Sequence, residues 1–367
     1  HVTGIETIEL GDATTSVVAV EGLVANGATL VVDGSALTTG TLNWNGAAET
    51  DGTFSVTGGD LGDTIVGGAL NDTIDGGDGN DSLTGGAGDD DIIGGNGDDT
   101  IVIGAGADSV DAGDHDDLII AAGNLSVADT ISGGDGADKL TFTDSDSATT
   151  DLDHVTGIET IELGNANTSV VTRDSLVASG ATLVVDGSAL TTSTLNWDGA
   201  AETDGTFSIT GGALADTIVG GALNDTIDGG NGNDSLTGGE GDNLIAAGSG
   251  DDTVTAGSGS DTVTAGEGDN IVTAGDGANS ITAGSGSDTI TAGSGSDTIL
   301  AGDGDNLVTA GDGDNSITAG TGDDTITTGA GEDVISTGAG ADLITAGAGN
   351  DDIDAGAGSD TIVGADN

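Results

Sequence analysis

Aspartate recurs every nine residues over two long stretches of this chain, and glycine recurs with it. A typical unit, residues 76–84, reads GGDGNDSLT, with glycine at positions 1, 2 and 4, aspartate at position 6 and an aliphatic residue at position 8. Glycine-rich turns expose backbone carbonyl oxygens, and position 6 adds a carboxylate. An all-oxygen site of flexible geometry suits Ca²⁺ better than Mg²⁺, which demands a near-ideal octahedron. The spacing therefore predicts a row of calcium sites.

Position 6 supplies most of the predicted metal ligands. The aspartates are Asp72, Asp81, Asp90, Asp99, Asp108, Asp117, Asp138, Asp225, Asp234, Asp252, Asp261, Asp288, Asp297, Asp324, Asp333, Asp342, Asp351 and Asp360. Asparagine takes this position at Asn243, Asn270, Asn279, Asn306 and Asn315. Those five units carry an acid at position 3 instead, and the predicted ligands include Glu240, Glu267, Asp276, Asp303 and Asp312.

Aspartate and asparagine alternate along each side of the predicted fold, because turns on one side are two units apart. Two explanations are open. The alternation can keep identical carboxylates from stacking, since like charges in direct register repel, while the acid at position 3 keeps each ion supplied. It can equally be the trace of a duplicated 36-residue segment, which is four units of nine residues.

The nine-residue unit predicts an all-β solenoid. Only position 8 is consistently apolar, so a short strand at positions 7–9 points that side chain inward. Two units make one 18-residue coil, and stacked coils form two parallel sheets in which each strand bonds to the strand two units away. Burial is sparse and stacked carboxylates repel each other. Cation binding that exists only in the folded form contributes folding free energy, so we expect the chain to be disordered without calcium and rigid with it.

Two repeats of different length organise the chain. HVTGIETIELG begins at His1 and again at His154. We expect irregular β segments at residues 1–57 and 154–210, nonapeptide blocks at 58–141 and 211–363, and a polar bridge at 142–153. The first block is interrupted at 121–132, and the second contains about 17 units, because 153 residues divide by nine. Apolar runs at 5–10, 30–33, 41–44 and 53–57 predict that the irregular segments are either an irregular β-solenoid or a small β-sandwich.

The units resemble the RTX repeat, G-G-x-G-x-D-x-U-x, which binds calcium in a parallel β-helix. Residues 76–84, 94–102 and 229–237 match every fixed position. The resemblance implies a right-handed parallel β-roll with calcium between adjacent turns, and secretion from a bacterium through a type I system. Most units after Ala247 begin with alanine or threonine rather than glycine. Leucine replaces the position-4 glycine at Leu61, Leu70, Leu214 and Leu223, which argues against calcium in those turns.

His115 also occupies position 4, beside Asp114, Asp116 and Asp117. It is either a transition-metal ligand or a tolerated turn substitution. Trp44 and Trp197 are equivalent in the long repeats, as are Phe54 and Phe207. We expect these aromatic residues to anchor the core rather than to stack on a ligand.

Charge and composition exclude several functions. The net charge is −63, with 65 acidic residues against 2 basic ones. Such a chain cannot offer the cationic face that nucleic acid or an anionic membrane requires. Cysteine is absent, so there is no disulfide and no zinc–thiolate site. The chain has no H-E-x-x-H, G-x-S-x-G or Walker motif, and we expect no enzyme.

These observations favour a secreted calcium-binding structural protein that binds on the order of 20 Ca²⁺ ions, taking one per good turn. We expect it on a bacterial cell surface or in the extracellular space. We expect it to self-associate into a layer, fibre or filament, with cell-surface polysaccharide as another potential partner. Two alternatives are the calcium-stiffened stalk of a large RTX adhesin, with a threonine face that orders ice, and the folding and secretion tail of an RTX enzyme or toxin. A further feature, threonine at position 9 from Thr255 to Thr345 on one sheet, reflects either strand propensity or such a binding face.

Overall fold

The structure is a computed structural model that describes residues 4–144 and 148–364. Every helix or strand in these residues is a β-strand, and the assigned pairs are parallel. No helix in this part of the chain is long and apolar enough to cross a membrane. The chain divides into two compact units, residues 1–164 with 175–178, and residues 165–174 with 179–367.

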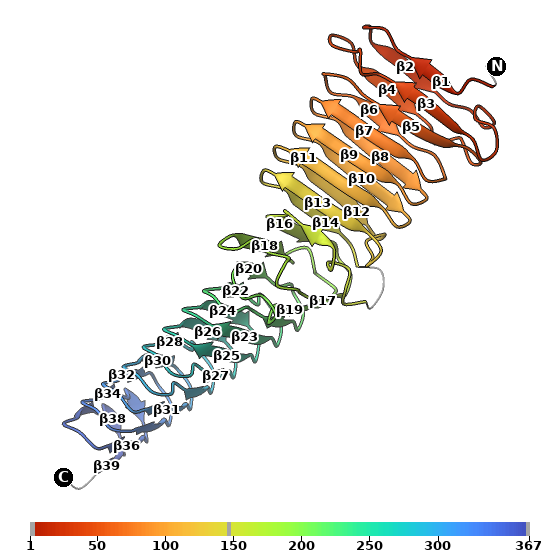
Figure 1. Cartoon of the computed structure of the whole chain (residues 1–367). Coiled ribbons are helices and arrows are strands. Elements are labelled where there is room, and N and C mark those ends of the chain that lie inside the picture. The colour runs from red at the N-terminus through yellow and green to blue at the C-terminus, as the bar shows by residue number, and fades with distance from the viewer. Residues whose placement is uncertain (1–3, 145–147, 365–367) are drawn as a thin grey trace. The chain divides into compact units, whose positions relative to one another are not determined.

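The first unit stacks its strands into two parallel sheets, one of odd-numbered and one of even-numbered strands (Figure 1). The odd-numbered strands are β1 (Thr7–Glu9), β3 (Thr29–Asp33), β5 (Thr53–Thr57), β7 (Thr73–Asp78), β9 (Asp91–Asn96), β11 (Ser109–Asp114), β13 (Thr130–Asp135) and β15 (Val155–Thr156). The even-numbered strands are β2 (Thr15–Val18), β4 (Leu42–Asn45), β6 (Thr64–Val66), β8 (Ser82–Ala87), β10 (Thr100–Ala105), β12 (Leu118–Ala122), β14 (Lys139–Phe142) and β16 (Thr160–Leu163).

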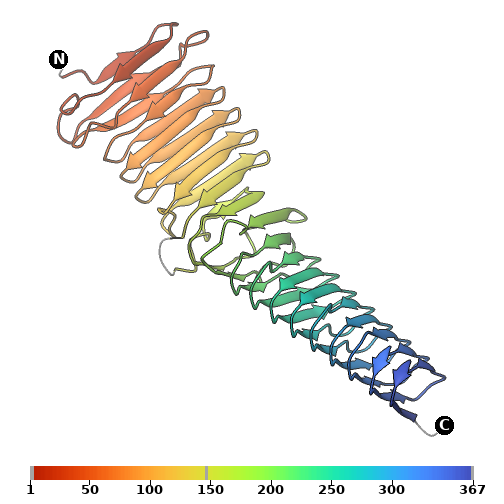
Figure 2. The ribbon, with the colours of Figure 1, turned by 180° about the vertical axis from the view of Figure 1, so that it is seen from behind.

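The second unit repeats this arrangement, and its regular coils are seen from behind in Figure 2. One sheet contains β17 (Thr168–Val171), β19 (Leu195–Asp198), β21 (Thr217–Val219), β23 (Ser235–Glu240), β25 (Thr253–Ser258), β27 (Ile271–Thr273), β29 (Thr289–Thr291), β31 (Leu307–Gly311), β33 (Thr325–Thr328), β36 (Leu343–Gly347) and β39 (Thr361–Gly364). The other contains β18 (Thr182–Asp186), β20 (Thr206–Thr210), β22 (Thr226–Asp228), β24 (Leu244–Ser249), β26 (Thr262–Glu267), β28 (Ser280–Thr282), β30 (Thr298–Gly302), β32 (Ser316–Ala319), β34 (Val334–Ser336) and β37 (Asp352–Asp354). β35 (Ala339–Gly340) pairs with β38 (Ala357–Gly358).

The strand register confirms a solenoid of 18-residue coils. Thr73 pairs with Asp91, which is 18 residues further along, and the same step recurs through both nonapeptide blocks. The irregular segments continue the stack with wider coils: Thr7 pairs with Val31, a step of 24, and Thr15 with Leu42, a step of 27. These segments are therefore an irregular β-solenoid, and the alternative of a small β-sandwich is wrong.

The predicted interruption in the first block is a local widening of the coil. The step from Ser109 to Thr130 is 21 residues, three more than in the regular coils. The strand register also shifts at β12, between Ile120 and Ala122. The extra residues are accommodated at the turn, so the stack of parallel strands continues through the interruption.

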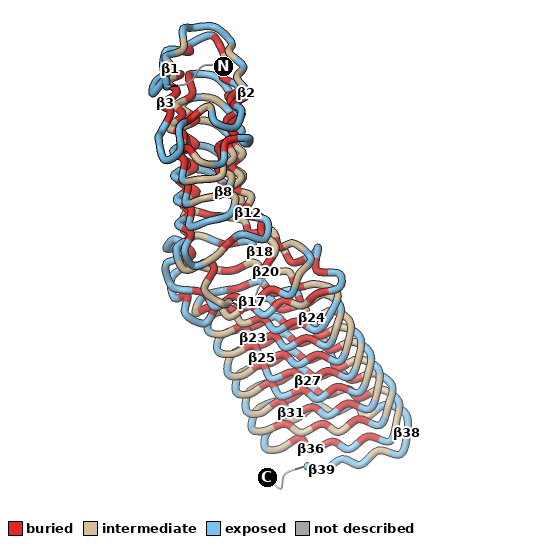
Figure 3. The backbone as a smooth tube through the Cα atoms, turned by 90° about the vertical axis from the view of Figure 1, so that its right-hand side faces the viewer, coloured by how far each residue is buried: buried red, intermediate tan, exposed pale blue. Residues whose placement is uncertain are grey.

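The core is a file of aliphatic side chains between the two sheets, and buried positions line the inside of each coil in Figure 3. Position 8 points inward as predicted: Ile74, Leu83 and Ile92 are fully buried. Many strands run for six residues rather than the predicted three, from position 7 of one unit to position 3 of the next. Because side chains alternate along a strand, position 1 also points inward, and Ile103 and Ala256 are fully buried there.

The two tryptophans anchor the irregular segments, as predicted. Trp44 and Trp197 are fully buried. Trp44 packs edge-on against Phe54 with ring centroids 5.2 Å apart, and Trp197 against Phe207 at 5.7 Å. The wider coils enclose a thicker core than the nonapeptide coils do, and the aromatic pairs fill it.

One outer face of the second unit carries an unbroken row of threonines at position 9. Register pairs join Thr237, Thr255, Thr273, Thr291, Thr309, Thr327 and Thr345 in sequence. The adjacent position 7 alternates between threonine and exposed aliphatic residues, including Ile271, Leu307 and Leu343. The predicted ladder therefore exists and faces outward.

Candidate metal centres

The position-6 side chains form continuous hydrogen-bonded ladders along each solenoid. The backbone N–H of Asp63 donates to Oδ1 of Asp81 at 2.6 Å, the N–H of Asp81 donates to Asp99 at 2.7 Å, and the pattern repeats every 18 residues. The sequence analysis missed this role, because it assigned position 6 only to metal binding. It also missed Asp129, in the interruption, and Glu159, which accept the equivalent bonds.

The second carboxylate oxygen of most position-6 aspartates has no partner. Among the described residues this oxygen, Oδ2, is buried without a hydrogen bond in fourteen of them. They are Asp81, Asp90, Asp99, Asp108, Asp117, Asp138, Asp234, Asp252, Asp261, Asp288, Asp297, Asp324, Asp333 and Asp342. A buried carboxylate oxygen without a donor is costly, and a bound cation would satisfy it.

The space beside position 1 is lined by oxygen atoms. A Cβ built on Gly76 would collide with Oδ2 of Asp81 and would crowd the carbonyl oxygen of Gly94 in the next coil. Gly94 and Gly85 show the same convergence in their own coils. The donors offered at this place are a carboxylate and a backbone carbonyl, which is a hard oxygen set of the kind that calcium prefers. The residues present therefore fit the predicted ion.

The opening two turns of each block are arranged differently. Oδ2 of Asp72 accepts the N–H of Gly68, and Oδ2 of Asp225 accepts that of Gly221. Asp63 and Asp216 make the same bond within their own turns. These are the four turns with leucine at position 4, so the leucine substitution coincides with a carboxylate that is already satisfied.

The five asparagines place a hydrogen-bond donor where the aspartates place Oδ2. Their Oδ1 atoms accept the ladder bond, for example Asn279 from Asp261 at 3.0 Å. That bond fixes the orientation of the amide, and Nδ2 of Asn279 then faces the carbonyls of Gly275 at 3.2 Å and Ala292 at 3.4 Å. The other four asparagines, Asn243, Asn270, Asn306 and Asn315, make corresponding bonds to turn carbonyls. In these turns the amide group meets the demand that a cation would meet elsewhere.

The acids at position 3 of the asparagine units lie on the exposed outside of the turns. Asp276 accepts the N–H of Ser294 at 3.1 Å, and Asp303 accepts the N–H and the hydroxyl of Thr321, both at 2.9 Å. Asp312 accepts the N–H of Ala330, and Glu240 and Glu267 are also exposed. Hydrogen bonds from Ser294 and Thr321 lower the pKa values of Asp276 and Asp303. These side chains therefore tie consecutive coils together on the surface.

Four further predicted residues complete the description. Asp351 and Asp360, in the last coils, are half-buried and accept the N–H groups of Asp333 and Asp342. His115 has a φ of 86°, within the left-handed range that the position-4 glycines also adopt. No group of three close metal-binding side chains in the described residues includes His115 or its neighbour Asp117.

Burial raises the pKa of the aspartates in the all-aspartate ladder. The pKa of Asp81 rises to about 7 because of burial and the neighbouring charges of Asp99 and Asp63. Burial also raises the pKa values of Asp90 and Asp117 to about 7 and that of Asp99 to about 6. Where asparagine is the neighbour, its side chain donates to the aspartate and opposes the effect of burial. The alternation thus relieves charge in the ladder.

The raised pKa values predict that acid stabilises the calcium-free fold. A carboxyl group that binds its proton more tightly when folded stabilises the fold below its unfolded pKa of about 3.9, and this contribution is lost as pH rises through the folded pKa. For Asp81 and Asp99 that loss falls at about 7 and about 6. In calcium-depleted buffer, circular dichroism should show more β-structure at pH 5 than at pH 8. Equal or greater structure at pH 8 would contradict this prediction.

Comparison with known families agrees with the geometry. A family model described as RTX calcium-binding nonapeptide repeat (4 copies) matches the chain repeatedly, between residues 57 and 143 with a short gap and continuously from 210 to 362. No curated protein matches the chain.

Proposed function

The chain belongs to the family of RTX calcium-binding nonapeptide repeat proteins, and from this we propose that it is a secreted structural protein that becomes rigid on binding calcium outside the cell. The observation that carries the proposal is the row of fourteen buried aspartate oxygens without partners in the described residues. Extracellular calcium-binding modules work at dissociation constants of about 10⁻⁴ to 10⁻³ M. A chain with this demand would stay unfolded before export and would fold on reaching calcium.

We further propose that copies of the chain stack end to end. An internal precedent supports this: β14, which ends the first nonapeptide block, pairs with β16, so that Leu140 lies beside Ile161. β16 is the equivalent of β1 in the second long repeat, because Ile161 corresponds to Ile8 at an offset of 153 residues (161 − 8). Within the described residues β1 pairs only with β3.

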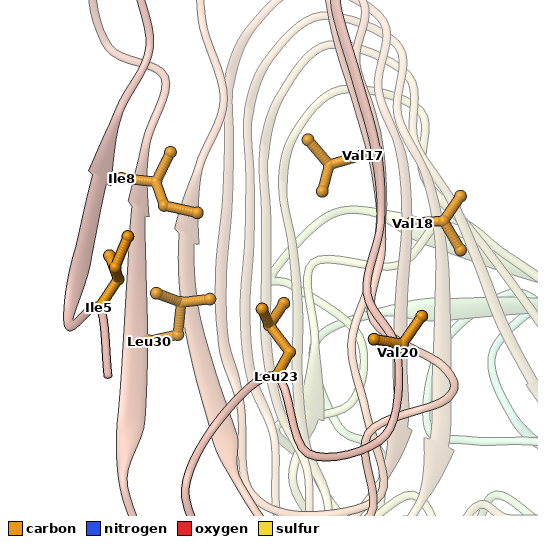
Figure 4. Close-up of a pocket in the computed structure, with 7 residues that line it drawn as sticks. All are labelled: Ile5, Ile8, Val17, Val18, Val20, Leu23 and Leu30. Atoms are coloured by element: carbon orange, nitrogen blue, oxygen red, sulfur yellow. The ribbon is translucent and has the colours of Figure 1, made fainter. Parts of the chain in front are cut away.

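The region around β1 is apolar and open. A cavity of about 520 Å³ lies there, lined by Ile5, Ile8, Val17, Val18, Val20, Leu23 and Leu30 (Figure 4). Ile5 is 45% exposed, whereas its equivalent Ile158 is buried. Ile362, at a core position of the final coil, is 51% exposed. A nonapeptide coil of a second copy would cover the cavity as β14 covers β16. Such a head-to-tail contact does not close on itself and produces filaments.

Electron microscopy and sedimentation in calcium test the assembly. We expect filaments from the native chain and monomers from Ile8→Asp, because a carboxylate in the apolar contact is costly. Val334→Asp is the control, since Val334 projects from the side of the solenoid and is 52% exposed. A calcium-bound native chain that stays monomeric at all concentrations would contradict self-assembly and would favour the stalk of an adhesin.

The threonine ladder is the observation that favours an adhesin stalk. It presents seven outward threonines in register from Thr237 to Thr345, and inhibition of ice growth by the calcium-bound chain would support that alternative.

A further inference from the structure

A cluster of three carboxylates lies outside the nonapeptide repeats, in the first irregular segment. Glu21 follows β2, and Glu49 and Asp51 lie between β4 and β5. One oxygen of each lies within 4.8 Å of one oxygen of both others. Glu21 and Glu49 are 28 residues apart (49 − 21) and belong to successive wide coils. The cluster therefore joins two coils.

The second irregular segment contains the same cluster. Asp174 follows β17, and Glu202 and Asp204 lie between β19 and β20. Their oxygens also lie within 4.8 Å of one another. Each residue stands 153 positions after its counterpart, as 202 − 49 shows for the central glutamate. Asp174 replaces Glu21, so the carboxylate is kept although the residue type changes.

The central glutamate is buried in both copies. Glu49 and Glu202 are fully buried. Glu202 uses Oε1 to accept the N–H groups of Asp204 at 3.2 Å and Gly205 at 2.9 Å. Its Oε2 is buried and has no hydrogen-bond partner, and in the first copy Oδ1 of Asp51 is buried and unpartnered as well. Each cluster thus gathers three acidic groups around at least one carboxylate oxygen that no donor satisfies.

The spacing of the oxygens suits a single large cation. Ligand atoms bound at about 2.4 Å from one calcium ion lie at most about 4.8 Å apart, twice that distance. Three carboxylates supply hard, anionic donors, and the wide turns leave backbone carbonyls and water to complete the shell. Without a cation, three like charges around a buried group would repel one another.

We propose that each irregular segment holds one calcium ion in this cluster, a site distinct from the nonapeptide turns. The ion would join the turn after β2 to the turn after β4, and likewise the turn after β17 to that after β19. Its place in the stack gives it a role. The carbonyl of Glu49 accepts the N–H of Ala69, and that of Glu202 accepts the N–H of Ala222. Each cluster therefore adjoins a leucine turn whose own aspartate is already satisfied, and it would pin the wide coil where the repeat sites are absent.

Terbium luminescence separates these sites from the repeats. Tb³⁺ replaces Ca²⁺ at oxygen sites and emits when a nearby tryptophan transfers energy to it. The chain has two tryptophans and no tyrosine. Trp44 is five residues before Glu49 (49 − 44), and Trp197 five before Glu202 (202 − 197). Tryptophan-excited emission from the full chain should therefore come mainly from the two clusters.

Isosteric amide substitutions test each cluster while keeping hydrogen-bond acceptors. We expect Glu21→Gln with Asp51→Asn to lower the emission to about half, and Asp174→Asn with Asp204→Asn to remove the other half, because each ion needs its three carboxylates. Glu6→Gln with Glu9→Gln removes two exposed charges from the same segment and should leave the emission unchanged. Circular dichroism in calcium confirms that each variant is folded.

The outcome is separable from that of the repeat sites. Equilibrium dialysis counts all the calcium bound by the native chain and so tests the repeats. Full emission in both double variants, with folding intact, would overturn the proposal even if the dialysis shows many ions. Loss of emission in the cluster variants would support it even if the repeats bound none.

Discussion

Removing calcium at pH 8 is expected to abolish most of the β-structure of this chain, and restoring calcium to recover it. At this pH the buried aspartates, whose pKa values reach at most about 7 in the folded chain, would be ionised. Their unpartnered oxygens would then be buried charges without a donor or counter-ion, which is costly in every coil. Because the coils stack only on their neighbours, the cost adds along the solenoid.

Far-UV circular dichroism during a calcium titration measures this change. Magnesium at equal concentration is the control, since it keeps its water shell and needs a regular octahedron that these turns do not offer. We expect magnesium to recover little of the signal. A spectrum that is the same in chelator and in calcium would contradict the prediction.

Replacing Asp99 by alanine should produce the largest effect of any single substitution in the ladder. Oδ1 of Asp99 accepts the N–H of Asp81 at 2.7 Å, and its Oδ2 is one of the unpartnered oxygens. Alanine removes both atoms. Leaving a buried N–H without an acceptor costs about 1–3 kcal/mol, and the proposed calcium site is lost as well. In calcium, the thermal midpoint of unfolding should fall, and one ion or more should be lost.

Two matched variants divide this effect into its parts. Asp99→Asn keeps the acceptor and adds the amide donor that Asn279 uses, so it should lose calcium and still retain more stability than alanine. Asp91→Ala removes a charge of the same type from an exposed position in a neighbouring unit, and surface substitutions usually change stability by less than about 0.5 kcal/mol. If all three variants unfold at the same temperature, Asp99 has no special role.

The sequence predicted the coil because its signal is periodic. Aliphatic residues at position 8, such as Ile74 and Leu83, define the inward face directly. Two units per coil followed from the reversal of the chain in each turn, and the 18-residue register agrees. Position 1 was missed as a core position, because glycine and alanine there gave little hydrophobic contrast.

The site could be predicted in its residues but only partly in its contacts. Position 6 was recognised as the acidic ligand, yet its bond to the N–H of the neighbouring coil depends on stacking that one unit does not reveal. The alternation of aspartate and asparagine was seen, but the amide contacts of Asn279 with turn carbonyls needed the structure.

The cluster of Glu21, Glu49 and Asp51 had a weaker signal. Its members are far apart in the chain and follow no short period. Only the occurrence of acids at the corresponding places in both long repeats could have indicated it, and many exposed acids recur in the same way.

Anomalous scattering from a crystal grown in calcium tests the central claim most directly, because it locates the ions without reference to stability. The account predicts calcium peaks beside Oδ2 of the aspartates that have no partner, such as Asp81, Asp99 and Asp261. It predicts none beside Oδ2 of Asp63 or Asp216, which accept backbone N–H groups. Peaks confined to exposed surface acids, with none beside the buried position-6 carboxylates, would contradict it.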